Sequence, residues 1–380
     1  MANKKILFIS NIADEKIGSF SLASIKAAER TGFEFHIASN FGKSSIEQRK
    51  KDEEKYNIKI HHIDFIRNPL NPKNVKAYKQ ILKLMKQENF DVVHCNTPVG
   101  GVYGRLAAKK CGIKTIIYQV HGFHFYKGAP KLNWMVYYPI EKILAHITDI
   151  IITINHEDFN FAQKLTLRKK GNVYYVPGVG IDIEIYKNIE INRIEYRKSI
   201  GLKDTDIVLI SVGRLDPNKN NSTLIKSIFL LEDPKFHLVI CGSGVQDKEL
   251  KKLAKDFNVE NQIHFLGNRL DMTQLYKMSD IFVMASFREG LSRAIMEAMA
   301  SGLPCVVSKI RGNKDLIHDD KGGFLVNPNH SEEFTEKFRL LKDNTVRKGM
   351  SDYNINMIKK FSIENVIDNL ESIYKMLYKN

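Results

Sequence analysis

Short apolar runs alternate along the chain with stretches in which apolar residues recur every three or four positions. In the first half, six runs have the length and flanking residues of buried strands, at 4–10, 33–39, 91–96, 115–120, 149–154 and 172–177. Stretches with helical periodicity lie between them, at 20–31, 73–89 and 99–111. This alternation predicts an α/β domain built on a doubly wound parallel sheet.

A second series begins after residue 200. Its predicted strands are 206–213, 236–242, 263–267, 280–286 and 304–308, and its predicted helices are 218–231, 245–257, 271–278 and 292–301. The segment 176–187 contains one proline and two glycines and is the best candidate for the crossover. We therefore predict two domains, 1–180 and 181–361. A last helical pattern covers 362–380, and the pattern leaves its return to the first domain open.

Length and composition agree with this organisation. The 380 residues suffice for two domains, and 43% hydrophobic with 27% charged residues exclude a disordered chain. No uncharged apolar run reaches 18 residues, and the N-terminus lacks a signal-peptide core, so neither a membrane span nor secretion is expected. The four cysteines are far apart without a CxxC pair, which predicts reduced thiols in a cytoplasmic protein.

The net charge of +15 is unevenly distributed. Residues 1–180 contain 28 Lys and Arg against 15 Asp and Glu, whereas residues 181–380 are nearly neutral. Such an excess suits an anionic membrane surface, a phosphate-bearing substrate or nucleic acid, although a Lys-, Ile- and Asn-rich composition produces it without any function. No nucleic-acid-binding motif accompanies it, so nucleic acid ranks last.

The predicted helix 73–89 carries two neighbouring stripes. The apolar stripe comprises Val75, Tyr78, Leu82 and Met85, which predicts contact with the core. The basic stripe comprises Lys76, Lys79, Lys83 and Lys86. The basic stripe is either a solvated face or a surface that docks on anionic lipid.

The segment 118–139 begins with a buried strand, after which His121 follows. A histidine in this place either faces a ligand at the carboxyl end of the strand or plays a structural role. The segment also contains aromatic residues among lysines, including Trp134, the single tryptophan of the chain. Such a mixture suits a membrane interface or a lipid-bearing substrate, or else a core-packed loop.

The segment 286–308 follows a predicted strand. Glu289 and Gly290 lie in the turn, and Ser292 is a typical N-cap for the helix that follows. The turn combines a carboxylate with free backbone N–H groups, which suits sugar hydroxyls, and Glu297 could bind a ribose diol two helical turns later. Taken alone, the two glutamates favour a simpler interpretation, in which Glu289 is a loop charge and Glu297 caps a surface helix.

The segment 209–220 places Arg214 and Lys219 after another strand. Two cations beside a helix N-terminus suit a diphosphate, although solvated loops of this kind are common. The GSG at 242–244 lacks the third glycine of a dinucleotide fingerprint, so it predicts a tight turn only.

Taken together and in this order, these motifs resemble the family 4 retaining glycosyltransferases of GT-B architecture. The resemblance rests on His121–Gly122, on Arg214 with Lys219, and on Glu289 and Glu297 eight residues apart. The stretches 121–142 and 310–317 resemble a subgroup found in bacterial capsule and exopolysaccharide clusters. The resemblance implies two Rossmann-like doubly wound domains facing across a cleft, with the acceptor on the N-terminal domain and a nucleotide-sugar on the C-terminal one.

The resemblance also implies which residues hold the donor. Arg214 and Lys219 would hold the diphosphate, and Glu297 the ribose. The donor sugar would contact Glu289 and the backbone of the three residues after it, Gly290, Leu291 and Ser292. With two cations supplying positive charge, the mechanism requires neither a metal nor another cofactor.

Four further positions transfer from the family. His121 would lie near the sugar and the leaving group, and Asn268 and Arg269 would contact the base. The family often has a Gly-Gly pair in its first loop near the donor phosphate, whereas this chain offers only Gly18 there, within 13–21.

The expected activity is transfer of a hexose or N-acetylhexosamine from a UDP-sugar. The expected acceptor is an undecaprenyl-diphosphate-linked saccharide at the cytoplasmic face of the membrane, which the basic N-terminal half would bind. A nucleotide-sugar epimerase of GT-B fold and a non-catalytic nucleotide-sugar-binding component of an assembly complex are the alternatives.

Overall fold

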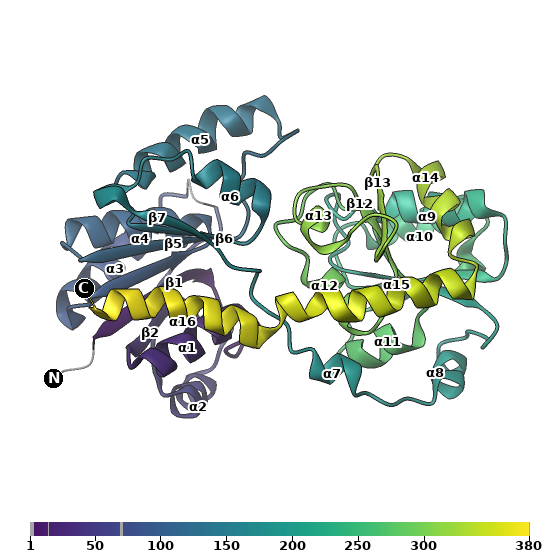
Figure 1. The fold of residues 1–380 in the computed structure, drawn as a ribbon, viewed down its shortest axis with the longest axis horizontal. Helices are drawn as coiled ribbons and strands as arrows, with labels where there is room; N and C mark the ends of the chain where they lie inside the picture. The colour runs from purple at the N-terminus through teal and green to yellow at the C-terminus, as the bar shows by residue number, and fades with distance from the viewer. Residues whose placement is uncertain (1–3, 14, 69–70, 380) are drawn as a thin grey trace. The chain divides into compact units, whose positions relative to one another are not determined.

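The computed structural model describes residues 4–13, 15–68 and 71–379, and they form two compact units (Figure 1). Unit 1 runs up to Gly180 and resumes at Ile363, and unit 2 comprises Ile181–Ser362. Of the predicted segments, 13–21 includes Asp14 and 362–380 ends at Asn380, both outside the described residues. Each unit is a parallel sheet with helices on both faces, as the two series of strands and helices predicted.

The sheet of unit 1 has seven strands in the order β3-β2-β1-β4-β5-β6-β7, all paired in parallel. They are β1 (Lys5–Ile12), β2 (Glu34–Asn40), β3 (Ile58–His62), β4 (Val92–Asn96), β5 (Thr115–Val120), β6 (Ile150–Thr153) and β7 (Asn172–Tyr175). The sequence patterns did not predict β3. It is an edge strand whose Lys59 and His62 are exposed, so it lacks the continuous apolar run of a buried strand.

Two helical layers cover this sheet. One apolar cluster joins the sheet to α1 (Ser19–Thr31) and α16 (Ile363–Lys379), with α2 (Ile46–Tyr56) at its edge. The other cluster joins it to α3 (Asn74–Glu88), α4 (Pro98–Lys110), α5 (Lys131–Ala145) and α6 (His156–Ala162). The basic excess of the N-terminal half is therefore divided between two different surfaces.

The last helix, α16, returns to unit 1 and completes its core. Four apolar residues of one α16 face are buried, namely Val366, Ile367, Leu370 and Ile373. The hydroxyl of buried Tyr374 lies 2.7 Å from Nδ1 of His94 on β4. On the surface, the Arg30 guanidinium of α1 pairs with three α16 carboxylates, those of Glu364, Asp368 and Glu371.

The structure tests two predictions for the α3–α6 layer, the apolar stripe of α3 and the role of the aromatic segment 118–139. The predicted apolar stripe of α3 is confirmed in three of its four residues: Met85 is buried and Tyr78 and Leu82 pack against the core, whereas Val75 is 52% exposed. The buried face of the helix also includes Asn74, Ala77 and Ile81. The aromatic segment belongs to the core, because Phe123 and Phe125 are buried and Trp134 packs 5.4 Å from the Phe125 ring. Its aromatic rings are therefore buried or partly buried in core packing, with Trp134, Tyr137 and Tyr138 among the partly buried ones.

Unit 2 contains a six-stranded sheet in the order β10-β9-β8-β11-β12-β13, also parallel. Its strands are β8 (Ile207–Val212), β9 (Phe236–Cys241), β10 (Ile263–Gly267), β11 (Ile281–Met284), β12 (Cys305–Ser308) and β13 (Gly323–Val326). The sequence patterns did not predict β13, which is four residues long and lies at the sheet edge. Among the described residues, no helix is long and apolar enough to cross a membrane.

The helices of unit 2 lie between and around these strands. They are α7 (Glu184–Lys187), α8 (Arg193–Ser199), α9 (Asn221–Leu231), α10 (Asp247–Asp256), α11 (Met272–Met278), α12 (Arg293–Ala300), α13 (Asn313–Leu316), α14 (Ser331–Leu340) and α15 (Asn344–Met357). The apolar side chains of these helices pack against both faces of the sheet and form two core clusters.

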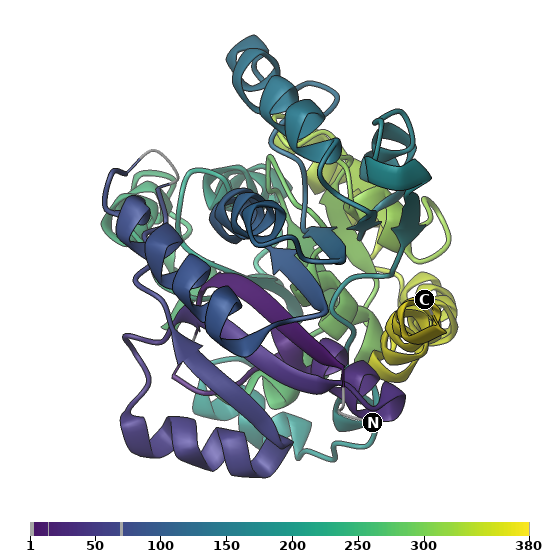
Figure 2. The same cartoon turned by 90° about the vertical axis from the view of Figure 1, so that its left-hand side faces the viewer.

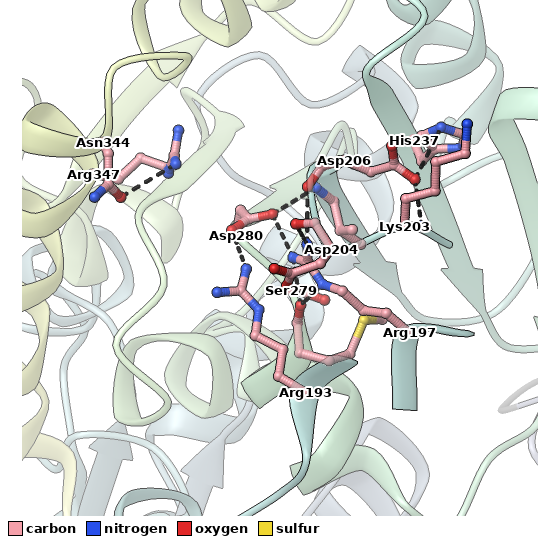
Figure 3. Close-up of polar contacts among 12 residues, drawn as sticks. Arg193, Arg197, Lys203, Asp204, Asp206, His237, Ser279, Asp280, Asn344 and Arg347 are labelled. Atoms are coloured by element: carbon pink, nitrogen blue, oxygen red, sulfur yellow. Dashed lines mark hydrogen bonds and ion pairs between the residues drawn. The ribbon is translucent and has the colours of Figure 1, made fainter. Parts of the chain in front are cut away.

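A fully buried arginine ties α8 to the amino ends of the strands (Figure 3). The Arg197 guanidinium donates to the carbonyl oxygens of Met278, Asp204 and Asp206 at 2.8–2.9 Å. It also donates to the Asp280 carboxylate at 2.7 Å, and Arg193 contacts the same carboxylate from the surface at 2.5 Å. The buried positive charge is thus neutralised and hydrogen-bonded from several elements at once.

This network predicts unequal costs for the two arginines. Arg197→Met should lower the free energy of unfolding by about 3–5 kcal/mol, because three carbonyl oxygens lose their buried charged donor and the Asp280 carboxylate is left with Arg193 and the Val208 N–H. Arg193→Met, its more exposed counterpart, should cost about 1 kcal/mol or less. Urea unfolding monitored by circular dichroism measures both, and equal losses would contradict the assignment.

Candidate active site

The predicted donor residues of unit 2 follow three strands of one parallel sheet, β8, β10 and β11. All strands of such a sheet end at one edge, so the loops after β8, β9, β10 and β11 lie together there. Strands β8 and β11 are direct neighbours although 68 residues separate the end of one from the start of the other. The loops that follow these two strands carry the cations and the carboxylates of the candidate site.

An ion pair joins these two loops. The Lys219 ammonium lies 2.8 Å from Oε1 of Glu289, and both side chains are mostly shielded from solvent, with exposures of 21% and 15%. Gly213 has a φ of +154°, and a Cβ there would lie only 2.9 Å from the Lys219 Cε. The glycine therefore leaves room for the lysine to fold back toward the carboxylate.

Backbone contacts hold the same two loops in register. The Phe287 N–H donates to the carbonyl oxygen of Asn218 at 2.8 Å, and the Asn218 amide donates to the Arg288 carbonyl oxygen at 3.0 Å. The Asn220 amide donates to the carbonyl oxygens of Ala285 and Pro328. The ion pair thus sits on a hydrogen-bonded frame rather than between two independent loops.

Glu297 is held in place from two sides. Nε of Arg293 donates to one carboxylate oxygen at 2.8 Å, and the buried Tyr276 hydroxyl donates to the other at 3.0 Å. Burial, with the nearby Glu297 charge, holds the Tyr276 pKa well above its usual value, so the hydroxyl stays a donor. As predicted, Ser292 caps α12, accepting from the Ile295 N–H. The cap and these donors fix the glutamate on the first two turns of the helix.

Arg214 differs from Lys219. Its side chain is 66% exposed and pairs with Asp216 at 2.9 Å. Beneath it, the GSG turn touches the backbone of the same loop: a Cβ on Gly242 would lie 1.9 Å from the Gly213 carbonyl oxygen, and one on Gly244 would lie 2.2 Å from that of Leu215. The turn therefore supports the cationic loop, a role that its sequence alone did not indicate.

The residues assigned to the base lie after β10. Oδ1 of Asn268 accepts from the Ser243 hydroxyl of the GSG turn at 3.1 Å. Arg269 donates to both oxygens of Asp271, at 2.8 and 2.5 Å, and this pairing lowers the Asp271 pKa to about 2. Asn268 thus joins the β9 and β10 loops, and Arg269 is engaged by a carboxylate.

The loop assigned to the donor sugar has a neighbour that the sequence analysis used only for the subgroup resemblance. A Cβ on Gly312, in the segment 310–317, would lie 2.2 Å from the Gly290 carbonyl oxygen and 3.2 Å from the Leu291 Cα. Arg311 beside it is almost fully buried. The glycine after the arginine was the available signal, because only glycine permits such a close approach of two backbones.

Gly18 and His121 belong to unit 1, and the remaining predicted site residues belong to unit 2. His121 follows β5 and its Nε2 lies 2.9 Å from Oδ1 of Asn96 at the end of β4, with the Phe20 ring 4.5 Å away. Because an amide oxygen only accepts, Nε2 carries the proton. Burial lowers the His121 pKa to about 4, so the ring is neutral at pH 7.

Gly18 is the N-cap of α1 and is exposed, with no atom within 4 Å of a Cβ built on it. Nothing in its surroundings therefore requires glycine, and its assignment to the donor phosphate stays a prediction. Within the described part of the chain, no group of three or more His, Cys, Asp or Glu side chains could hold a metal ion.

Family models match both units. The model of group 1 glycosyl transferases matches residues 192–357, and the model of 4-like glycosyl transferases matches residues 5–155. EpsD of Bacillus subtilis strain 168, whose name as a glycosyltransferase is provisional, is 34% identical over 379 residues, 98% of this chain and 96% of EpsD. The chain therefore belongs to the GT4-like, group 1 glycosyltransferases.

Two further proteins are similar to this chain over most of its length. An Escherichia coli enzyme named UDP-Gal:alpha-D-GlcNAc-diphosphoundecaprenol alpha-1,3-galactosyltransferase is 32% identical over 309 residues, 80% of this chain and 79% of the enzyme. The structure of Anabaena HepE in complex with UDP and glucose has a TM-score of 0.79 at 21% identity, with all of both chains covered. The fold is GT-B and the activity class is glycosyl transfer, which disfavours the epimerase and the non-catalytic alternatives.

Two histidines of unit 1, the buried His94 and the partly buried His121, predict a pH-dependent stability. Burial lowers the pKa of His94 to about 3 and that of His121 to about 4, below the value of about 6.5 in the unfolded chain. Unfolding therefore takes up protons as the pH falls from 6.5 toward 4, which removes roughly 2 kcal/mol per histidine by pH 5.

Denaturant unfolding at pH 7 and pH 5 measures this loss. His94→Gln should make the decrease smaller, because glutamine has no proton to take up, whereas His156→Gln at an exposed position of unit 1 should leave it unchanged. A decrease of the same size in the His94 variant would show that other groups cause the effect.

Proposed function

We propose that this glycosyltransferase moves a hexose or N-acetylhexosamine from a UDP-sugar to an undecaprenyl-diphosphate-linked saccharide, with retention of anomeric configuration and without a metal. The observation that carries the proposal is the Lys219–Glu289 pair at the carboxyl edge of the unit 2 sheet. The UDP-Gal and diphosphoundecaprenol in the name of the E. coli relative, and the UDP bound to HepE, support the choice of donor and acceptor.

The ion pair suits a donor that carries both negative charge and hydroxyl groups. When a diphosphate binds, its oxygens replace Glu289 as the partner of Lys219, because they carry more charge in the same place. The released carboxylate then accepts hydrogen bonds from sugar hydroxyls, beside the backbone of Gly290, Leu291 and Ser292. Arg214 reaches the diphosphate from its exposed position by leaving Asp216.

The remaining contacts position the nucleoside. Glu297 accepts from the ribose hydroxyls through its two oxygens, whose orientation Arg293 and Tyr276 fix. Asn268 and Arg269 contact the uracil from the loop after β10. In this assignment, residues that follow three strands of one sheet, β8, β10 and β11, contact one donor molecule.

The chemical step requires no enzyme nucleophile. The bond from the anomeric carbon to the diphosphate oxygen breaks with its electron pair going to UDP, and Lys219 and Arg214 stabilise the developing charge. The acceptor hydroxyl forms its bond to the same carbon from the same face, and its proton passes to the leaving phosphate oxygen. Because two cations supply the positive charge, added chelator should leave transfer unaffected.

The acceptor is proposed to bind unit 1 at the cytoplasmic face of the membrane, in capsule or exopolysaccharide synthesis. The support is the charge distribution, with 28 Lys and Arg against 15 Asp and Glu in residues 1–180. Basic residues attract the anionic headgroups of the cytoplasmic leaflet by about 1 kcal/mol each near the surface.

A panel of nucleotide-sugars tests the function directly. Purified protein without acceptor should be stabilised against heat by one UDP-sugar, release UDP slowly, and transfer the sugar once a lipid-diphosphate acceptor is added, with or without EDTA. Clean interconversion of two UDP-sugars would replace the proposal by an epimerase, and absence of binding to every nucleotide-sugar would remove the donor site.

A substitution tests the central contact. Lys219→Ala should lower kcat by roughly 10²–10³-fold, because it removes a cation from the charge that develops on the leaving group. The matched control is Lys226→Ala, which removes an exposed lysine of the following helix α9. This variant should retain full activity. Turnover of the Lys219 variant close to that of the unchanged protein would remove this lysine from the mechanism.

A further inference from the structure

Helix α5 presents an apolar face to solvent. Trp134, Tyr137 and Tyr138 on its inner side pack against the core of unit 1. The outer side carries six exposed apolar residues over three turns, namely Leu132, Met135, Val136, Pro139, Ile140 and Ile143. Three of them expose well over half of their surface: Leu132 (66%), Met135 (74%) and Ile143 (70%). Such a stripe, at i, i+3, i+4, i+7, i+8 and i+11, normally faces a core.

The charges around this face have one sign. Lys131 and Lys142 lie on the same flank of the apolar stripe, eleven residues and about three turns apart, and both are exposed. The single carboxylate of the helix, Glu141, is buried and pairs with Arg105 of α4 at 2.9 Å. Helix α5 therefore presents an apolar stripe bordered by lysines, without an exposed carboxylate that would repel an anionic surface.

The basic border continues over the neighbouring helices. Helix α4 contacts both α3 and α5, and α5 lies at the periphery of unit 1 in both views (Figures 1 and 2). The exposed charged side chains of the three helices are all lysines: Lys76, Lys79, Lys83, Lys86, Lys109, Lys110, Lys131 and Lys142. The partly buried Glu88 pairs with Lys5, so it does not offset them.

The opposite layer of unit 1 has a different character. Helices α1, α2 and α16 expose carboxylates among their basic residues, including Glu29, Glu47, Glu364 and Asp368. A second copy of the chain would thus offer its own mixed surface or the same basic one, and two like-charged faces repel each other. The lysines of α3, α4 and α5 and the apolar stripe of α5 complement an extended partner that has negative charges at its surface and an apolar layer below them.

We propose that the outer face of α5 inserts into the interface of an anionic lipid bilayer while the lysines of α3, α4 and α5 contact the headgroups. The inference rests on the proposed function, because it identifies the surface of unit 1 that reaches a lipid-linked acceptor. A helix that lies in the membrane plane with its apolar side among the acyl chains and lysines at its edges has this composition. The aromatic residues of the same segment only anchor the helix to the core.

The position of α5 in the chain relates this surface to the candidate site. The helix begins ten residues after His121, at the end of the loop that leaves the carboxyl end of β5. The Asn133 amide donates to the His124 carbonyl oxygen at 2.9 Å, and the Trp134 indole N–H donates to that of Tyr126. The loop that carries the histidine is therefore fastened to the helix that meets the bilayer.

Binding of the full chain to vesicles, without substrates, tests the proposal. The protein should co-sediment with vesicles that contain phosphatidylglycerol and not with pure phosphatidylcholine, and part of the binding should persist at high salt. Met135→Asp/Ile143→Asp should weaken binding about tenfold or more at every salt concentration, since it places two charges among acyl chains. Lys131→Ala/Lys142→Ala should weaken it mainly at low salt.

The matched control is Ile46→Asp on α2, which changes an equally exposed residue (68%) on the other layer of the same unit. It should bind vesicles like the unchanged protein. Undiminished binding of the α5 aspartate variant would overturn the proposal. A dimer in solution that the same substitutions dissociate would overturn it too, because a second copy would then cover the face.

Transfer assays separate this proposal from the proposed function. The α5 aspartate variant should keep full turnover on a detergent-dispersed acceptor and lose it on acceptor embedded in vesicles. If no variant transfers any sugar but vesicle binding still depends on α5, the membrane surface stands and the proposed function fails. Loss of turnover on the dispersed acceptor as well would place α5 in the transfer step and overturn a purely membrane-binding role.

Discussion

The reversal of strand order within a parallel sheet is the constraint on which the rest of this structure depends. In unit 2 the chain adds β9 and β10 on one side of β8 and then returns to place β11 on the other side. The loops after β8 and β11 must therefore leave in opposite directions, which opens a crevice at the sheet edge. Lys219 and Glu289 come from these two loops, and their pairing follows from the topology.

This geometry also explains what the sequence could predict. Strands buried on both faces, such as β1 and β8, give continuous apolar runs and were found. The edge strand β3 was missed because it contains exposed Lys59 and His62, and β13 was missed although it is apolar, because its run is only four residues long. The candidate site residues were assigned from the family resemblance, and their roles stay predictions. Their mutual contacts were not predictable, because the partners are 70 residues apart and meet only once the sheet has formed.

Side-chain exposure was harder to predict than secondary structure. An apolar stripe and a set of aromatic residues both invite assignment from composition alone, yet Val75 is exposed and Phe125 is in the core. Helical periodicity fixes which residues share a face and leaves the rotation of the helix to its neighbours. On α5 the aromatic side chains satisfy the core, so the aliphatic side chains are left outside.

Helix α16 gives unit 1 a particular order of assembly during translation. The chain leaves unit 1 at Gly180, builds all of unit 2, and only then supplies the helix whose Tyr374 reaches His94. While the ribosome is making residues 181–362, the sheet face beneath α16 is open to water and to other nascent chains. The N-terminal unit is thus the last to be completed, and its apolar face needs protection for the time taken to translate the other unit.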